Sequence, residues 1–237
     1  TQNQSSAASD VYKRQFEEQA VSLGGQLALG ENTVAKLSVL GTENEVDFDN
    51  TFGDDFGQYT VSNTLSTALA LETSLTPALH WSTTLGLNED EAETFSGFPS
   101  VFETSRESLG TELSWNQHAD LVVTIGADYY QEEIDSTNDY ELTERDNAGV
   151  YGQLKYSGDR VALVTSLRYD DNSAYGTNTN GSVAASYQFT DQVRVVASYG
   201  TAFVAPSFNY LYYPFFGNPD ILPEESKSTE LSLVGEH

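Results

Sequence analysis

Short and long connections alternate strictly along this chain, between segments in which every second residue is apolar. The short connections fall at residues 30–32, 74–77, 116–119, 157–159 and 190–191. The longer polar stretches fall between them, at about residues 44–58, 91–103, 134–144, 171–180 and 204–224. Strands joined by short turns on one side and by long loops on the other are typical of an outer-membrane β-barrel. A soluble β-sandwich has no reason to sort its loops in this way.

The segments themselves have the two-residue period of β-strands. Around residues 121–130, Leu121, Ile125 and Tyr129 fall on one face, while Thr124 and Asp128 fall on the other. Small hydroxyl, glycine and charged side chains suit a wide, hydrated lumen better than a packed core. Aromatic residues gather near the strand ends, as in the two aromatic girdles of a barrel, although the β-propensity of Tyr and Phe offers an alternative explanation.

About eleven strands follow one another from residues 19–29 to residues 225–237. The expected fold is all-β, an antiparallel up-and-down transmembrane barrel segment that occupies residues 16–237. An odd number of strands does not close a typical bacterial single-chain barrel, so we expect a piece of a larger one. Residues 1–15 are interpreted as a non-native or disordered segment, because 6–15 resemble a translated sequencing-adapter scar.

Composition excludes several classes of function. Ten basic residues stand against 36 acidic ones, a net charge of −26 that argues against a nucleic-acid partner. The chain has no cysteine, and no apolar run approaches the ~18 residues of a membrane helix. The three histidines are isolated, and neither G-x-S-x-G nor H-E-x-x-H occurs, so we expect no enzymatic activity.

One motif carries a specific resemblance. The stretch from Tyr199 to Glu230 is similar to the barrel of TonB-dependent outer-membrane receptors, in which a strand ending in Y-G-x-x-(F/Y)-x-A-P precedes an aromatic loop and a G-N-P-x-L-x-P-E-x-S segment. The matching residues here are Tyr199, Gly200, Phe203, Ala205, Pro206, Gly217, Asn218, Pro219, Leu222, Pro223, Glu224 and Ser226. Proline removes a ladder donor where the strand ends, and Gly-Asn-Pro supplies turn geometry.

Within this family the likeness is strongest to the cobalamin (vitamin B12) transporters, over about residues 20–237. The resemblance implies a monomeric barrel of about 22 strands around a plug, embedded in outer-membrane lipid and lipopolysaccharide. It also implies active uptake of cobalamin, energised by TonB through an N-terminal segment that this chain lacks. A siderophore receptor shares much of the motif and stays an alternative, although the chain is poor in basic residues; a passive porin or adhesin barrel is a further one.

Acidic side chains crowd the long connections. Hard cations such as Ca²⁺ take six to eight oxygen ligands, and Asp-x-Asp spacing can supply several of them. Cobalamin transporters order extracellular loops with calcium, and the resemblance therefore makes Asp47, Asp49, Asp54 and Asp55 the candidate ligands. The alternative is a solvated acidic rim, adapted to salt or bridged to lipopolysaccharide phosphates by divalent ions.

The long connection after Pro206 is rich in aromatic residues. Such side chains can stack on a corrin ring or a siderophore, with a few polar groups fixing the orientation. The alternative is that about half of them pack against neighbouring loops. The predicted substrate-binding residues are Phe208, Asn209, Tyr210, Tyr212, Tyr213, Phe215 and Phe216.

Overall fold

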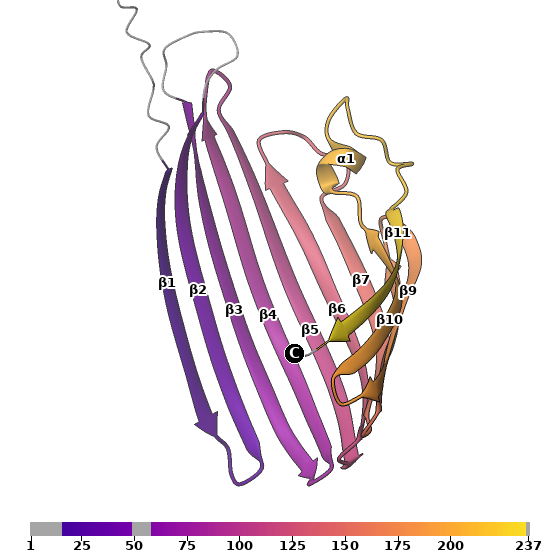
Figure 1. Cartoon of the computed structure of the whole chain (residues 1–237). Helices are drawn as coiled ribbons and strands as arrows, with labels where there is room; N and C mark the ends of the chain where they lie inside the picture. Colours follow the sequence, from indigo (N-terminus) through magenta and orange to yellow (C-terminus); the bar gives the residue numbers. More distant parts are fainter. Residues whose placement is uncertain (1–15, 49–57, 236–237) are drawn as a thin grey trace, which may run out of the picture.

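The computed structural model describes residues 16–48 and 58–235. Within these residues eleven strands form one sheet in chain order, and every neighbouring pair is antiparallel (Figure 1). The predicted number of strands and their up-and-down order are therefore confirmed. The strands are β1 (Phe16–Ala28), β2 (Thr33–Phe48), β3 (Gln58–Thr76), β4 (Leu79–Phe95), β5 (Ser100–His118), β6 (Leu121–Ser136), β7 (Glu144–Ser157), β8 (Val161–Asn172), β9 (Gly176–Thr190), β10 (Val193–Val204) and β11 (Glu224–Gly235).

The sheet curls into a trough, with β1 and β11 at its two margins (Figure 1). The five short connections predicted from the sequence all lie at one end, here called the turn end. The opposite end, the loop end, carries the connection from 205 to 223, here called the aromatic loop, with the short helix α1 (Phe208–Tyr212). No helix in the described residues is long and apolar enough to cross a membrane.

Several connections that the sequence suggested were long are mostly strand. β4 continues to Phe95 and β5 begins at Ser100, so that only residues 96–99 join them, instead of 91–103. Likewise only 173–175 separate β8 from β9, instead of 171–180. The backbone ladder continues past the apolar part of each strand, into positions that carry mostly polar and charged side chains. Composition alone therefore does not show where such strands end.

The two faces of the sheet match the predicted alternation. Leu65, Leu85 and Ile125 stand on the convex face, and each is about half exposed. On the other face, side chains reach across an intervening strand: Arg168 on β8 contacts Asp128 on β6. Second-neighbour strands lie roughly 10 Å apart, so such contacts form readily only where side chains converge. The polar face is therefore the concave one.

Candidate functional site

The aromatic loop begins where Pro206 ends the β10 ladder, and it folds into a compact structure. The side chain of Ser207 caps α1 by accepting a hydrogen bond from the Tyr210 backbone N–H at 3.2 Å. After α1 the chain turns back, and the Gly217 and Asn218 N–H groups donate to the Tyr213 and Tyr210 carbonyls at 2.7 and 2.8 Å. A Cβ at position 217 would lie 2.6 Å from the Leu211 carbonyl oxygen, so the glycine of the Gly-Asn-Pro segment is required by close backbone packing.

Three apolar side chains are buried in the aromatic loop and at the loop end of β6, and we call them the apolar seat. Phe208 and Leu211 from α1 are 5% and 1% exposed, and Ile134 from β6 is 3% exposed. Among the described residues these three are the buried large hydrophobic side chains, and Pro206 at the start of the loop is also buried. The buried apolar side chains therefore lie in the loop and at one end of β6 rather than along the length of the sheet.

Three charged residues from adjacent strands support the same loop, and we call them the arginine clamp: Arg106 on β5, Glu132 on β6 and Arg145 on β7. Glu132 pairs with Arg145 at 2.5 Å and with Arg106 at 3.2 Å. Arg145 also donates to the Pro206 carbonyl at 2.9 Å, and its guanidinium lies 4.5 Å from the Phe208 ring centroid. The clamp thus joins the wall of the sheet directly to the start of the aromatic loop.

Tyr140, in the connection between β6 and β7, is a second attachment point for the loop. Its hydroxyl donates to Asn209 Oδ1 at 2.5 Å, and its ring packs edge-on against Tyr213 with 5.8 Å between centroids. Burial, followed by the neighbouring Tyr213 phenol, raises the pKa of Tyr140 above its ordinary value. The neutral, hydrogen-bonding form of the phenol is therefore favoured in the folded loop.

The structure divides the predicted substrate-binding residues into two groups. Phe208 is buried in the seat, and Tyr213 packs against Tyr140. By contrast Tyr210 is 67% exposed, while Phe215 and Phe216 stand almost fully in solvent. Phe215 has a φ of +67°, the left-handed region that non-glycine residues rarely occupy. Rings available to a ligand therefore sit on a loop whose other aromatic residues hold it in place.

The predicted calcium ligands fall mostly outside the described residues, which include Asp47 but not Asp49, Asp54 or Asp55. Asp47 lies near the end of β2, directly opposite Tyr59 on β3. Within the described ranges, no three His, Asp or Glu side chains are grouped so that they could hold a metal ion. Calcium binding therefore stays a prediction.

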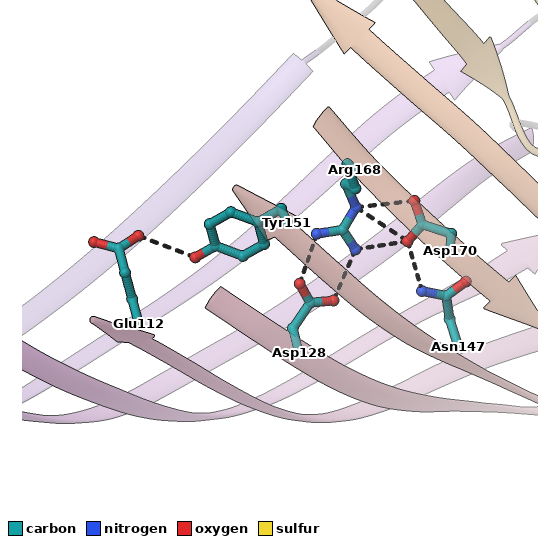
Figure 2. A network of polar contacts seen from close by, with 6 residues as sticks. All are labelled: Glu112, Asp128, Asn147, Tyr151, Arg168 and Asp170. Carbon is teal, nitrogen blue, oxygen red and sulfur yellow. Dashed lines mark hydrogen bonds and ion pairs between the residues drawn. The ribbon is translucent and has the colours of Figure 1, made fainter. Parts of the chain in front are cut away.

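The sequence did not predict a polar network on the concave wall below the loop (Figure 2). Arg168 makes a bidentate pair with Asp128, at 2.6 and 2.8 Å, and also binds Asp170 at 2.6 Å. Asp170 is further held by Asn147 at 3.0 Å. Arg168 and Asp170 are two residues apart, so the strand period puts them on one face of β8, and that was the available signal. The partnership with Asp128 depends on the register of three strands.

Two glycines make room for this network. Tyr151 on β7 passes over Gly126 on β6 and donates to Glu112 on β5 at 3.0 Å (Figure 2). A Cβ at Gly126 would lie 2.3 Å from the Tyr151 ring, and one at Gly149 would lie 2.2 Å from Arg168 Nη2. The wall is thus tied across strands, and the concave surface below the loop is a fixed one.

Comparisons with known proteins agree with this architecture. The family described as TonB dependent receptor-like, beta-barrel, matches residues 2–236. The vitamin B12 transporter BtuB of Photobacterium profundum is 34% identical over 209 residues, covering 85% of this chain and 34% of that protein. The vitamin B12 transporter of Vibrio cholerae is 40% identical over 111 residues, covering 46% of this chain and 18% of that protein. The chain thus spans about a third of the length of the Photobacterium transporter, and its match to the Vibrio cholerae transporter covers less.

Solved structures show the same fold at low sequence identity. The siderophore receptor PirA of Pseudomonas aeruginosa has a TM-score of 0.76 at 17% identity, covering 94% of this chain and 44% of that one. The copper transporter OprC has a TM-score of 0.74 at 16% identity, covering 94% and 43%. These barrels lie in the outer membrane, and their family consists of transporters and receptors rather than enzymes. The chain belongs to the TonB-dependent receptors, and it forms part of their outer-membrane β-barrel.

Proposed function

We propose that the receptor containing this chain imports cobalamin across the outer membrane, with energy supplied through TonB. The observation that carries the proposal is the 34% identity to a vitamin B12 transporter over 85% of the chain. The solved structures at 17% identity or less share the fold alone and carry no information on substrate. On this proposal the barrel segment contributes a rigid wall and part of the binding surface at the loop end.

The aromatic loop is the proposed contact for the corrin ring. A corrin is a broad ring system edged by amide groups, and aromatic side chains bind such faces while a few polar groups fix orientation. Tyr210, Phe215 and Phe216 present exposed rings on a loop held from below. Asn209 uses its carbonyl oxygen on Tyr140, which leaves its amide N–H groups available to an amide carbonyl of the ligand.

The test is cyanocobalamin binding to outer membranes that carry the full-length receptor, with ferric siderophores as competitors. Saturable binding that siderophores do not compete supports the proposal. Binding of ferric chelates without binding of cyanocobalamin, by a correctly inserted receptor, would overturn it in favour of a siderophore receptor. Uptake compared in cells with and without TonB tests the energy source, since binding should persist and accumulation should stop when TonB is absent.

We also propose that Ca²⁺ orders the connection between β2 and β3, with Asp47, Asp49, Asp54 and Asp55 as ligands. Carboxylates at Asp-x-Asp spacing can supply the oxygen ligands that this ion prefers. Chelation should weaken cyanocobalamin binding, and Asp54→Asn with Asp55→Asn should remove the response to chelator. The matched control is Glu89→Gln with Glu91→Gln, which takes two carboxylates from a neighbouring strand. Binding that ignores chelation would leave cobalamin as substrate and reject the metal site.

A further inference from the structure

We propose that Arg145 is a positioning residue, which holds the aromatic loop against the concave wall and thereby fixes its exposed rings for the ligand. The proposal rests on the proposed function only in taking the aromatic loop as a ligand-binding surface. Glu132 is its supporting partner. Neither residue belongs to the motif that carries the family resemblance, and neither is offered as a ligand contact.

Arg145 is the wall residue that contacts the loop at two separate points. Its Nη1 donates to the carbonyl of Pro206, the residue that ends the β10 ladder. Its guanidinium also lies over the ring of Phe208, the first residue of α1. Arg145 and Glu132 side chains are each 12% exposed, so these contacts form in a largely water-free place where charge-assisted hydrogen bonds are strong.

Glu132 orients the guanidinium of Arg145 but does not use all of its N–H donors. One carboxylate is shared between Arg145 at 2.5 Å and Arg106 at 3.2 Å, so two cations divide a single negative charge. Arg106 is held in turn above the Tyr130 ring, 3.8 Å from its centroid. The remaining donors of Arg145 are therefore directed to the loop, where a carbonyl and the face of an aromatic ring both attract a cation.

Arg145 adds to the attachment by Tyr140, because the short helix of the loop contributes little order of its own. An isolated helix as short as the five residues of α1 is not stable in water, since nucleation costs more than one turn returns. Its apolar seat consists of Ile134, Phe208 and Leu211. A binding surface that is already ordered loses less conformational entropy when the ligand binds. Its affinity for the ligand is therefore higher.

The first experiment measures loop order without any ligand. The 237 residues contain no cysteine, so Phe215→Cys, at a fully exposed position, gives a unique nitroxide attachment site within this segment of the full-length receptor. Any cysteine elsewhere in the receptor is replaced. We compare label mobility in outer membranes for the otherwise native receptor, Arg145→Gln, Arg145→Lys and Phe208→Leu. Phe208→Leu removes the ring from the loop side while leaving the wall intact.

The matched control is Lys36→Gln. Lys36 pairs with Glu72 at 2.6 Å on the same concave face, but near the turn end, and both side chains are nearly half exposed. The Lys36→Gln variant removes one cation and one ion pair from the wall and changes no contact of the aromatic loop. Resistance of each variant to unfolding by detergent at room temperature confirms that the barrel is folded.

We expect Arg145→Gln to mobilise the label strongly. In unlabelled receptors that keep Phe215, we expect Arg145→Gln to weaken cyanocobalamin binding by about tenfold, the effect of one hydrogen bond to a charged group. Arg145→Lys keeps the charge but not the planar fork, and it should restore only part of both. Phe208→Leu should mobilise the label, and Lys36→Gln should match the native receptor. If the label is as immobile in Arg145→Gln as in the native receptor, the inference is overturned.

Increased mobility with unchanged affinity would also overturn it, because the loop would then be held for reasons unrelated to binding. Failure of the proposed function looks different. The unmodified receptor would bind no cyanocobalamin, while the mobility measurement would still give its result. The affinity comparison would then be made with whichever ferric siderophore the receptor binds.

Discussion

Near the loop end, the carboxylates on the two faces of the same strands are arranged differently. On the convex face Glu91, Glu103 and Asp135 stand directly opposite one another on β4, β5 and β6. On the concave face every carboxylate of the wall network is tied to Arg168, Tyr151 or Asn147. Every ion pair between described residues is found on the concave face.

This difference shows what curvature does to a sheet. Side chains on the concave face converge and can bridge two strands, so that one arginine serves two carboxylates. Side chains on the convex face diverge into solvent, where like charges directly opposite cost only a few tenths of a kcal/mol to about 1 kcal/mol each. Carboxylates on the convex face can therefore stand opposite one another at little cost, whereas those of the concave network depend on hydrogen-bond and ion-pair partners.

The largest effect should follow from removing the central cation of the concave wall. Arg168→Met leaves Asp128 and the buried Asp170 facing each other without a cation, and Asp170 keeps only its hydrogen bond from Asn147. We expect a loss of about 3 kcal/mol, at the low end for a broken buried pair because Asp128 is 27% exposed. Thermal unfolding of the full-length receptor in detergent measures the change. Adding Asp170→Asn should recover part of it; an unchanged unfolding temperature in Arg168→Met would show that the wall does not depend on the pair.

A smaller effect should follow from filling the space that Arg168 occupies. Gly149→Ala places a methyl group 2.2 Å from Arg168 Nη2, and overpacking of this kind costs about 1–3 kcal/mol. The control is Gly152→Ala on the same strand but on the convex face, where the nearest atom is 3.8 Å away. Unfolding temperatures of the two variants should differ clearly, and equal values would argue against a rigid concave wall.

On the convex face the sign should reverse. Glu103→Gln removes a charge that lies between Glu91 and Asp135. We expect stabilisation of about 0.5 kcal/mol at low ionic strength, decreasing as added salt screens the repulsion. Unfolding temperatures at two salt concentrations test this. Destabilisation by Glu103→Gln would mean that the convex carboxylates are held by attractive contacts after all.

The smallest effect concerns Tyr140, where the wall meets the aromatic loop. Because its pKa is raised in the folded protein, its contribution is fully present below the ordinary value of about 10 and is lost as the pH rises through the higher folded value. Mobility of the label at Phe215→Cys should therefore rise only above pH 10. Tyr140→Phe should lack this step, and a step of equal size in that variant would assign the titration to another group.

Much of the candidate site could be anticipated, but not its division of roles. The motif from Pro206 to Pro219 marked the loop, and its aromatic residues were predicted as one group. Nothing in the sequence distinguishes the roles of Phe208 and Phe215, yet Phe208 is buried and Phe215 is fully exposed. The helical turn of α1 and the left-handed backbone at Phe215 decide this, and neither is readable from composition.

The sequence by itself determined the strands, their order, their tight turns and the polarity of their two faces, because these depend on local periodicity and turn chemistry. Only the tertiary structure decided where the acidic strands end, which carboxylates find a cation, and how Arg145 meets the loop that follows β10. Those contacts depend on the register of neighbouring strands and on curvature, which bring together residues as distant as Arg145 and Pro206. Distances of that kind are set by the whole sheet rather than by any segment of it.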